Sequence, residues 1–91
     1  MQVTLSGTGP LKRMVREGLS LDLPTGARIR DALTEASARL GDMAPVLQDE
    51  EGQTGPGIVV FVNDQMIRRN GADAELSDGD ELTVLMPVAG G

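Results

Sequence analysis

The last apolar run of the chain, LTVLMPV at residues 82–88, constrains the fold most strongly, because only three residues follow it. A run of this kind is typical of a strand in the core of a domain. The residues after it, Ala89, Gly90 and Gly91, carry almost no side chain, so we expect them to leave the folded body at once. Because glycine has no Cβ, such a tail can enter a channel that is too narrow for larger side chains. At its tip the tail presents a main-chain carboxylate, which we interpret as the working group of the protein.

Four other segments have the pattern of strands. Residues 2–6 and 19–23 each alternate apolar and polar side chains, which predicts two half-buried strands that pair as a hairpin. Residues 58–62, IVVFV, give the strongest strand signal because they are β-branched and nearly all apolar. A short strand is expected over residues 65–67, and the final strand over about residues 81–86.

One amphipathic helix is predicted over residues 28–40. Its apolar residues recur at helical spacing, with charged residues between them. Gly41 follows directly and is well placed to end the helix in a left-handed conformation. The start is less well defined, since the sequence has no clear capping box there. The apolar face consists of Ile29, Ala32, Leu33, Ala36 and Leu40.

The expected order is strand, strand, helix, strand, short strand, strand. A hairpin followed by a crossover helix and further strands predicts a mixed sheet of four or five strands, with the helix across one face. This is an α+β fold of the β-grasp type, as in ubiquitin. The 91 residues are enough for one modest core and too few for two. We therefore predict a β-grasp domain over residues 1–87 and a flexible tail over residues 88–91.

Composition argues against several function classes. The net charge of −6 argues against nonspecific nucleic-acid binding, which depends on basic residues, and suggests basic protein partners. No apolar stretch approaches the roughly 20 residues that span a bilayer, and the first residues lack the features of a signal peptide. We therefore expect a cytoplasmic protein with no membrane partner. Without cysteine the chain offers no thiol nucleophile, and with Phe61 as the only aromatic residue its core must be aliphatic.

Two acidic clusters, DEE at residues 49–51 and DGDE at residues 78–81, suggest metal sites at first sight. A calcium loop needs a longer ordered series of oxygen ligands, which neither cluster has. Asp78 and Asp80 are better explained by a turn around Gly79. We therefore predict no metal site.

The carboxy-terminal residues resemble a known family. Residues 76–91, LSDGDELTVLMPVAGG, are similar to the carboxy-terminal signature of the MoaD/ThiS family of ubiquitin-like sulfur carriers. VFVND at residues 60–64 also resembles the middle strand and turn of that family. The resemblance is strong over residues 58–91, weaker over the first strand and the helix, and thin over residues 7–18 and 42–57.

The resemblance implies a carrier rather than an enzyme, or the small non-catalytic subunit of a synthase. A partner resembling the ubiquitin-activating enzymes would adenylate the Gly91 carboxylate with ATP. A sulfur donor such as a sulfurtransferase would then form a thiocarboxylate, and a sulfur-accepting synthase would use it. ATP is needed by the activating partner, and no cofactor is expected to stay bound to the chain. Activation is required because an ionised carboxylate is a poor electrophile.

The resemblance also assigns roles to residues near the end of the chain. Gly90 and Ala89, preceded by Val88 and Pro87, are expected to thread the channel of a partner, with Pro87 limiting the freedom of the unbound tail. Leu85 occupies the position of an exposed apolar residue that the family uses to dock on partners.

Two further inferences concern the docking surface. If Leu82, Val84 and Met86 face the helix, alternation turns Leu85 to the opposite face of the sheet. Arg68 is a candidate for pairing with an acidic patch on a partner. The alternative for both Leu85 and Arg68 is a surface position with no partner.

The pathway stays open at this point. The commonest MoaD-type ending has two prolines before Val-Ala-Gly-Gly, whereas Met86 stands at the first of these positions and only Pro87 is kept. Carriers that serve molybdopterin, cysteine, thiamin or secondary-metabolite synthesis are therefore equally consistent with the sequence. Two other function classes also remain, a ubiquitin-like modifier joined to lysines through Gly91 and a non-catalytic β-grasp interaction domain.

Overall fold

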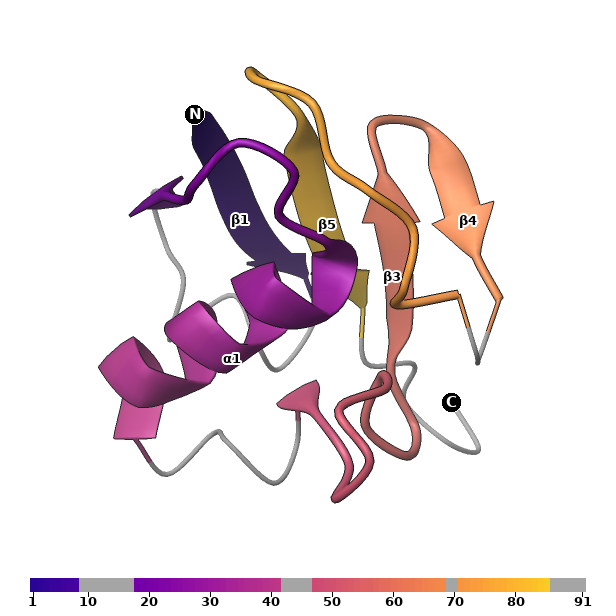
Figure 1. Cartoon of the computed structure of the whole chain (residues 1–91). Coiled ribbons are helices and arrows are strands. Elements are labelled where there is room, and N and C mark those ends of the chain that lie inside the picture. The colour runs from indigo at the N-terminus through magenta and orange to yellow at the C-terminus, as the bar shows by residue number, and fades with distance from the viewer. Residues whose placement is uncertain (9–17, 42–46, 69–70, 86–91) are drawn as a thin grey trace.

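The chain forms a five-stranded mixed sheet with one helix packed across it, in a computed structural model that describes residues 1–8, 18–41, 47–68 and 71–85 (Figure 1). The strand order in the sheet is β2-β1-β5-β3-β4. This is the predicted β-grasp architecture of the α+β class. The elements are β1 (Gln2–Thr8), β2 (Leu19–Asp22), α1 (Ile29–Leu40), β3 (Val59–Val62), β4 (Gln65–Ile67) and β5 (Glu81–Leu85).

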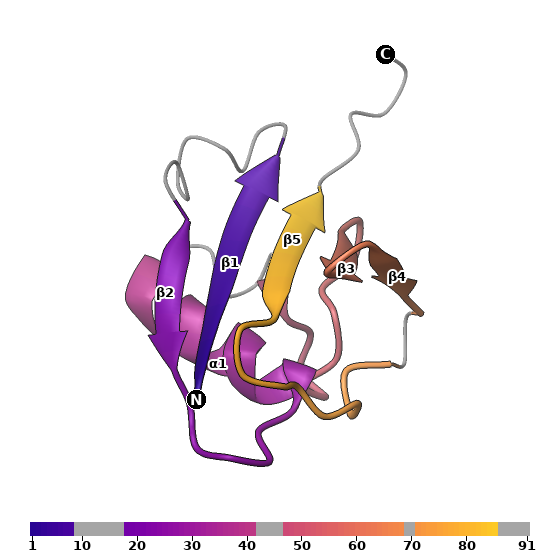
Figure 2. The same cartoon turned by 90° about the horizontal axis from the view of Figure 1, so that it is seen from above.

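The two terminal strands lie side by side in the middle of the sheet. β1 runs parallel to β5, with Leu5 opposite Leu82, and antiparallel to β2, as the predicted hairpin requires. On its other side β5 pairs antiparallel with β3, with Val84 opposite Val60. β2 and β4 therefore form the two edges, and α1 makes a second layer behind the sheet (Figure 2). Every side-chain direction on β5 is thus fixed by strands on both sides.

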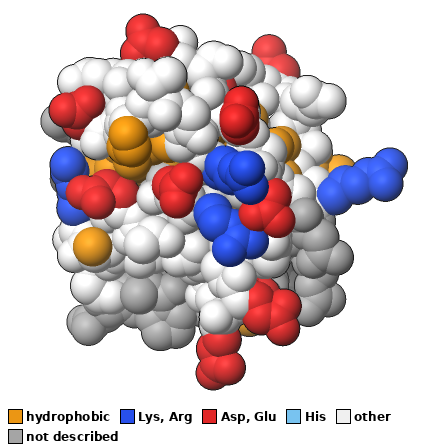
Figure 3. Space-filling view, in the orientation of Figure 1, with side chains coloured by type: hydrophobic (Ala, Val, Ile, Leu, Met, Phe, Trp, Pro, Cys, Tyr) orange, Lys and Arg blue, Asp and Glu red, His pale blue; other side chains and the backbone are white. Residues whose placement is uncertain are grey.

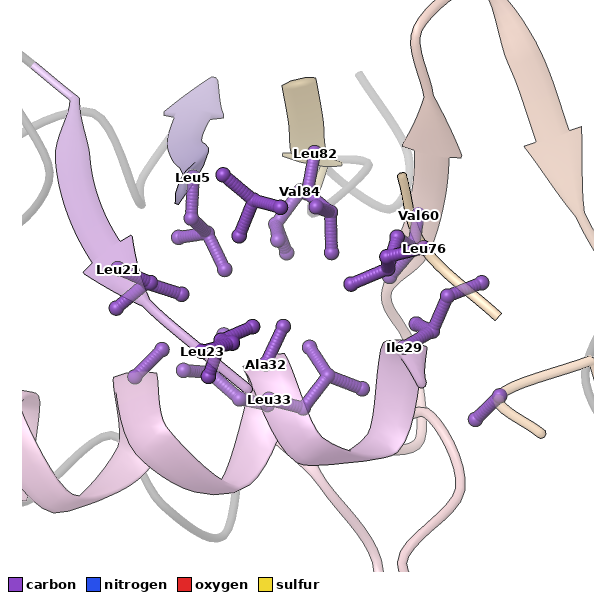
Figure 4. Packing of buried hydrophobic residues seen from close by; sticks show 14 of the residues in the cluster. Leu5, Leu21, Leu23, Ile29, Ala32, Leu33, Val60, Leu76, Leu82 and Val84 are labelled. Atoms are coloured by element: carbon purple, nitrogen blue, oxygen red, sulfur yellow. The ribbon is translucent and has the colours of Figure 1, made fainter. Parts of the chain in front are cut away.

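The core lies between the sheet and α1 and is aliphatic, as predicted. Alternate residues of the strands point toward the helix, where Leu5, Leu82 and Val60 are almost completely inaccessible to solvent (Figure 4). The helix contributes the apolar face that its spacing predicted, apart from Leu40, whose side chain lies outside the described part of the structure. Its buried residues are Ile29, Ala32, Leu33 and Ala36. Phe61 is not among the core residues and is only half-buried.

Main-chain groups at both ends of α1 find partners. At the start, the Arg28 amide donates to the Asp31 carboxylate at 2.8 Å, which is one half of a capping box. The sequence did not reveal it because arginine has no acceptor for the other half. The Ile29 amide also donates to the carbonyl of Ala74 at 3.0 Å. At the end, Gly41 has a positive φ of 59°, as predicted, but its ψ of −97° lies outside the left-handed helical region.

Residues 47–55, for which the sequence predicts no helix or strand, form a hairpin. The Asp49 amide donates to the Gln53 carbonyl at 3.0 Å, and the Gly55 amide donates to the Leu47 carbonyl at 2.9 Å. Gln53 is buried, and its side-chain carbonyl accepts a hydrogen bond from the Ala72 amide at 3.1 Å. The hairpin is therefore tied to a segment almost 20 residues away. This bond satisfies a buried main-chain donor that would otherwise destabilise the fold.

The two faces of β5 predict opposite responses to truncation. Leu82→Ala should lower the free energy of unfolding by about 2–5 kcal/mol, because it leaves a cavity between the sheet and α1. Thr83→Ala, on the other face of the same strand, should change it by about 0.5 kcal/mol or less. Urea denaturation followed by circular dichroism measures both. Equal losses in the two variants would contradict the placement of the core.

Candidate functional site

The predicted tail begins beyond the centre of the sheet. Pro87, Val88, Ala89, Gly90 and Gly91 lie outside the described residues, and their predicted roles stay predictions. The position from which the chain continues toward them is described. β5 ends between the last residue of β1 and the first residue of β3, so both of its neighbours hold that end. A partner that binds this end of the sheet therefore also contacts the strand that leads to the tail.

A patch of apolar side chains lies on the face of the sheet opposite α1. Val60 and Val84 are buried against the helix, so alternation places Val59, Phe61 and Leu85 on the other face. Leu85 lies opposite Val59, and Met66 lies opposite Phe61. Residues that pair directly across strands share a face. We call these four residues, Val59, Phe61, Met66 and Leu85, the open-face patch.

The open-face patch is accessible to solvent. Three of its residues are half-buried, and Met66 is 61% exposed, the highest exposure among the described large apolar side chains. The described residues place no helix on this face. A contiguous group of accessible apolar side chains is a candidate surface for contact with another protein. The predicted orientation of Leu85 is confirmed, while its contact with a partner stays a prediction.

Sequence analysis named only Leu85 from the open-face patch. Val59 and Phe61 belong to a predicted strand whose residues are nearly all apolar, so its two faces look alike in the sequence. Met66 belongs to the short predicted strand. A signal was present in the sequence, because the only aromatic residue of the chain lies two residues after Val59 and thus on its face. The position of Met66 beside Phe61 depends on the register across the turn, which the sequence did not fix.

Arg68 lies at the same end of the sheet as Leu85. Ile67 pairs with Val60, and Leu85 pairs with Val59, so both predicted docking residues lie beside the start of β3. Arg68 is exposed and has no ion pair with any residue that the structure describes. The structure thus brings the two predicted docking residues to one end of the sheet. Whether Arg68 pairs with a partner stays a prediction.

The acidic turn at the other end of β5 has a structural role. The Asp80 carboxylate accepts a hydrogen bond from the Ser77 amide at 2.7 Å, and the Asp78 carboxylate accepts one from the Gln2 amide at 2.8 Å. Gly79 has a φ of 86°, a conformation that glycine adopts without strain. These bonds confirm that Asp78 and Asp80 shape the turn before β5.

No helix within the described ranges is long and apolar enough to cross a membrane.

Comparisons with known proteins support the β-grasp fold described above. The profile of the ThiS family matches residues 9–91. Among solved structures, a chain of the BexX/CysO complex of Amycolatopsis orientalis is 33% identical, with a TM-score of 0.70 and coverage of 98% of this chain and 99% of the other. A putative molybdopterin converting factor, subunit 1, from Pyrococcus furiosus is 26% identical, with a TM-score of 0.72 and coverage of 97% and 99%.

SAMP1 from Haloferax volcanii shares the fold at 20% identity, with a TM-score of 0.82 and full coverage of both chains. No curated protein sequence gives a significant match.

Truncation of the open-face patch should leave the fold intact. Met66→Ser is expected to change the free energy of unfolding by about 0.5 kcal/mol or less, because that side chain is mostly in water. Ile67→Ser, one residue further on, removes a side chain that packs against the core and should cost about 1–3 kcal/mol. Urea denaturation of both variants checks the difference. A large loss in Met66→Ser would mean that the patch stabilises the fold and is not a free surface.

Proposed function

Because this chain belongs to the ThiS family, we propose that it is a sulfur carrier protein whose Gly91 carboxylate is adenylated and then converted to a thiocarboxylate. The observation that carries the proposal is the family match, which extends through residue 91 and so includes the Val-Ala-Gly-Gly ending. The similarity to a chain of a CysO-containing complex supports the same class. In this function the chain is a protein cosubstrate and not a catalyst.

The chemistry takes place on the main chain at Gly91. An oxygen of the carboxylate attacks the α-phosphorus of ATP, pyrophosphate leaves, and an acyl-adenylate forms. Hydrosulfide from the donor then attacks the acyl carbon, and AMP leaves to give the thiocarboxylate. If the donor presents a persulfide, AMP leaves to give an acyl disulfide, and a thiol then cleaves its S–S bond to release the thiocarboxylate and a disulfide. These steps need acid, base and phosphate-binding groups from the partner alone. That division of labour suits a chain without histidine or cysteine.

The fold contributes position. Because β5 is held between β1 and β3, its last residue, Leu85, has a fixed place on the body, and the predicted tail starts three residues later in the sequence. Burial of the open-face patch against a partner would supply binding energy through removal of apolar surface from water. Gly90 and Ala89 would then enter the partner's channel, with Leu85 and Pro87 orienting them. Three partners are required: an ATP-dependent adenylating enzyme, a sulfur donor and a sulfur-accepting synthase, all placed by this proposal in the cytoplasm.

The sulfur acceptor is proposed only as a class. The names of the similar structures point to molybdopterin synthesis and to a CysO-dependent reaction. Both kinds of acceptor would use the same thiocarboxylate, so the carrier chemistry is common to them. Thiamin and thiosugar synthesis use such a group in the same way and stay within the proposal.

Mass spectrometry of the intact chain tests the proposal. The chain is incubated with the adenylating enzyme of its own organism, ATP and a sulfur source. We expect a mass gain equal to the difference between one sulfur and one oxygen atom, located at Gly91. Deletion of Gly91, or addition of one alanine after it, should abolish the gain because the acyl carbon is then misplaced. Conjugates of higher mass, with no exchange of oxygen for sulfur, would instead identify a protein modifier.

Leu85 provides a test of docking that is separate from the chemistry. Leu85→Asp should raise the KM of the chain in the adenylation reaction about tenfold or more and leave kcat nearly unchanged, because it places a charge in the binding surface. Ser20→Asp, an exposed residue on β2 at the far edge of the sheet, is the matched control. Pyrophosphate exchange into ATP measures both. An unchanged KM in Leu85→Asp would remove the open-face patch from the docking surface.

A further inference from the structure

A hollow of about 400 Å³ lies between the turn before β3 and the end of β4. Its inner wall includes Ile58, which is almost completely buried, and Ile67, which packs against the core. The exposed Pro56–Gly57 turn and the exposed Arg68 also line the hollow. The full lining is residues 54–59 and 66–68. Such a volume is at the lower end of ligand-binding pockets, which are about 300–1,000 Å³.

The chemistry of the lining favours an apolar side chain over a polar metabolite. Small-molecule sites combine an apolar wall with several polar groups that converge on the ligand. Here Thr54 and Arg68 supply the only polar side chains of the lining, and Thr54 is buried. The two glycines of the lining add no side chain. A leucine, methionine or phenylalanine side chain from another protein therefore fits this hollow better than a polar ligand.

The hollow is continuous with the open-face patch and close to the end of β5. Val59 and Met66 belong to both the patch and the hollow. Val59 is also the residue opposite Leu85, the last residue of β5. A protein that covers the patch and takes up the tail therefore passes directly over the hollow.

The unpaired positive charge of Arg68 beside the hollow differs from most of the described surface. The chain carries a net charge of −6, so a carboxylate on another protein is repelled by most of it. Two of the other arginines are neutralised locally, since Arg30 pairs with Asp73 at 2.7 Å and Arg39 lies 3.5 Å from Glu35. Arg68 and Arg28 have no such pair among the described residues, and of these two only Arg68 lines the hollow. On the face drawn in Figure 3, acidic and basic side chains lie close together near the centre.

We infer that the hollow receives a large apolar side chain of the adenylating enzyme while Arg68 pairs with a neighbouring carboxylate of that enzyme. The inference rests on the proposed function. The adenylating enzyme is the partner concerned because the group on which it acts, a carboxylate after two glycines, has no neighbouring side chain by which this protein could be recognised. It must therefore recognise the body of this chain. A synthase instead meets a thiocarboxylate, which is distinctive by itself.

The two contacts contribute to binding in different ways. The apolar side chain contributes by leaving water, while the Arg68 pair fixes orientation, since a carboxylate placed elsewhere meets negative charge. Together they hold the body in one register, so that the acyl carbon of Gly91 reaches ATP. Without them the tail can still enter the channel, but less often. The expected loss is therefore in KM and not in kcat.

Two substitutions with matched controls test the inference by pyrophosphate exchange, using the adenylating enzyme alone as the probe. Arg68→Glu should raise KM about tenfold or more at low salt, and the difference from the unmodified chain should shrink at high salt. Arg39→Glu, on the exposed side of α1, is its control. Pro56→Asp places a charge on the rim of the hollow and should raise KM without strong salt dependence. Pro24→Asp, in the exposed turn before α1, is its control.

The outcomes separate this inference from the proposed function. Raised KM values in Arg68→Glu and Pro56→Asp, with controls and urea midpoints unchanged, support it. Exchange at the same KM in all variants overturns the inference and leaves the proposed function standing. Equal losses in variants and controls also overturn it, because the effect is then one of overall charge. If the unmodified chain supports no exchange, the proposed function fails and this inference fails with it.

Discussion

The parallel pairing of β1 with β5 in the centre of the sheet is the constraint on which the rest of the structure depends. It joins the two ends of the folded body, with Leu5 opposite Leu82. β3 then pairs with the free side of β5, so that the last strand is held along both edges. A strand held in this way cannot shift its register without moving buried leucines to the solvent face. The point at which the chain continues toward Gly91 is therefore set by the core itself.

This central strand also divides the molecule into two surfaces with different roles. Leu82 and Val84 face α1 and stabilise the fold, whereas Leu85 faces away from it and joins Val59, Phe61 and Met66. The only aromatic residue of the chain lies on the second surface and outside the core. Stability and, under the proposed function, partner binding can thus be changed separately by substitutions on opposite faces. The hollow beside Arg68 extends the second surface around the edge of the sheet.

Much of the fold could be predicted because it is recorded in periodic patterns. The spacing of Ile29, Leu33 and Ala36 indicated α1, and alternation in residues 82–85 indicated which way Leu85 points. The start of α1 was predicted to within one residue, but its capping bond was not, because the bond from the Arg28 amide to Asp31 has no counterpart from the arginine side chain. The hairpin at residues 47–55 was missed for a related reason, since it depends on the contact of Gln53 with Ala72. Contacts between distant residues leave no local pattern, and the hollow, formed by two separate segments, left none either.

The proposed function requires that an oxygen of the Gly91 carboxylate attacks ATP and that sulfur later replaces it. An isotope measurement tests this most directly. The chain is prepared with heavy oxygen in its terminal carboxylate and incubated with the adenylating enzyme, ATP and the sulfur source. If the carboxylate oxygen attacks the α-phosphorus, the AMP released during thiocarboxylate formation carries one heavy oxygen atom from the chain. AMP without the label, beside a chain that keeps both labelled oxygens, would contradict it.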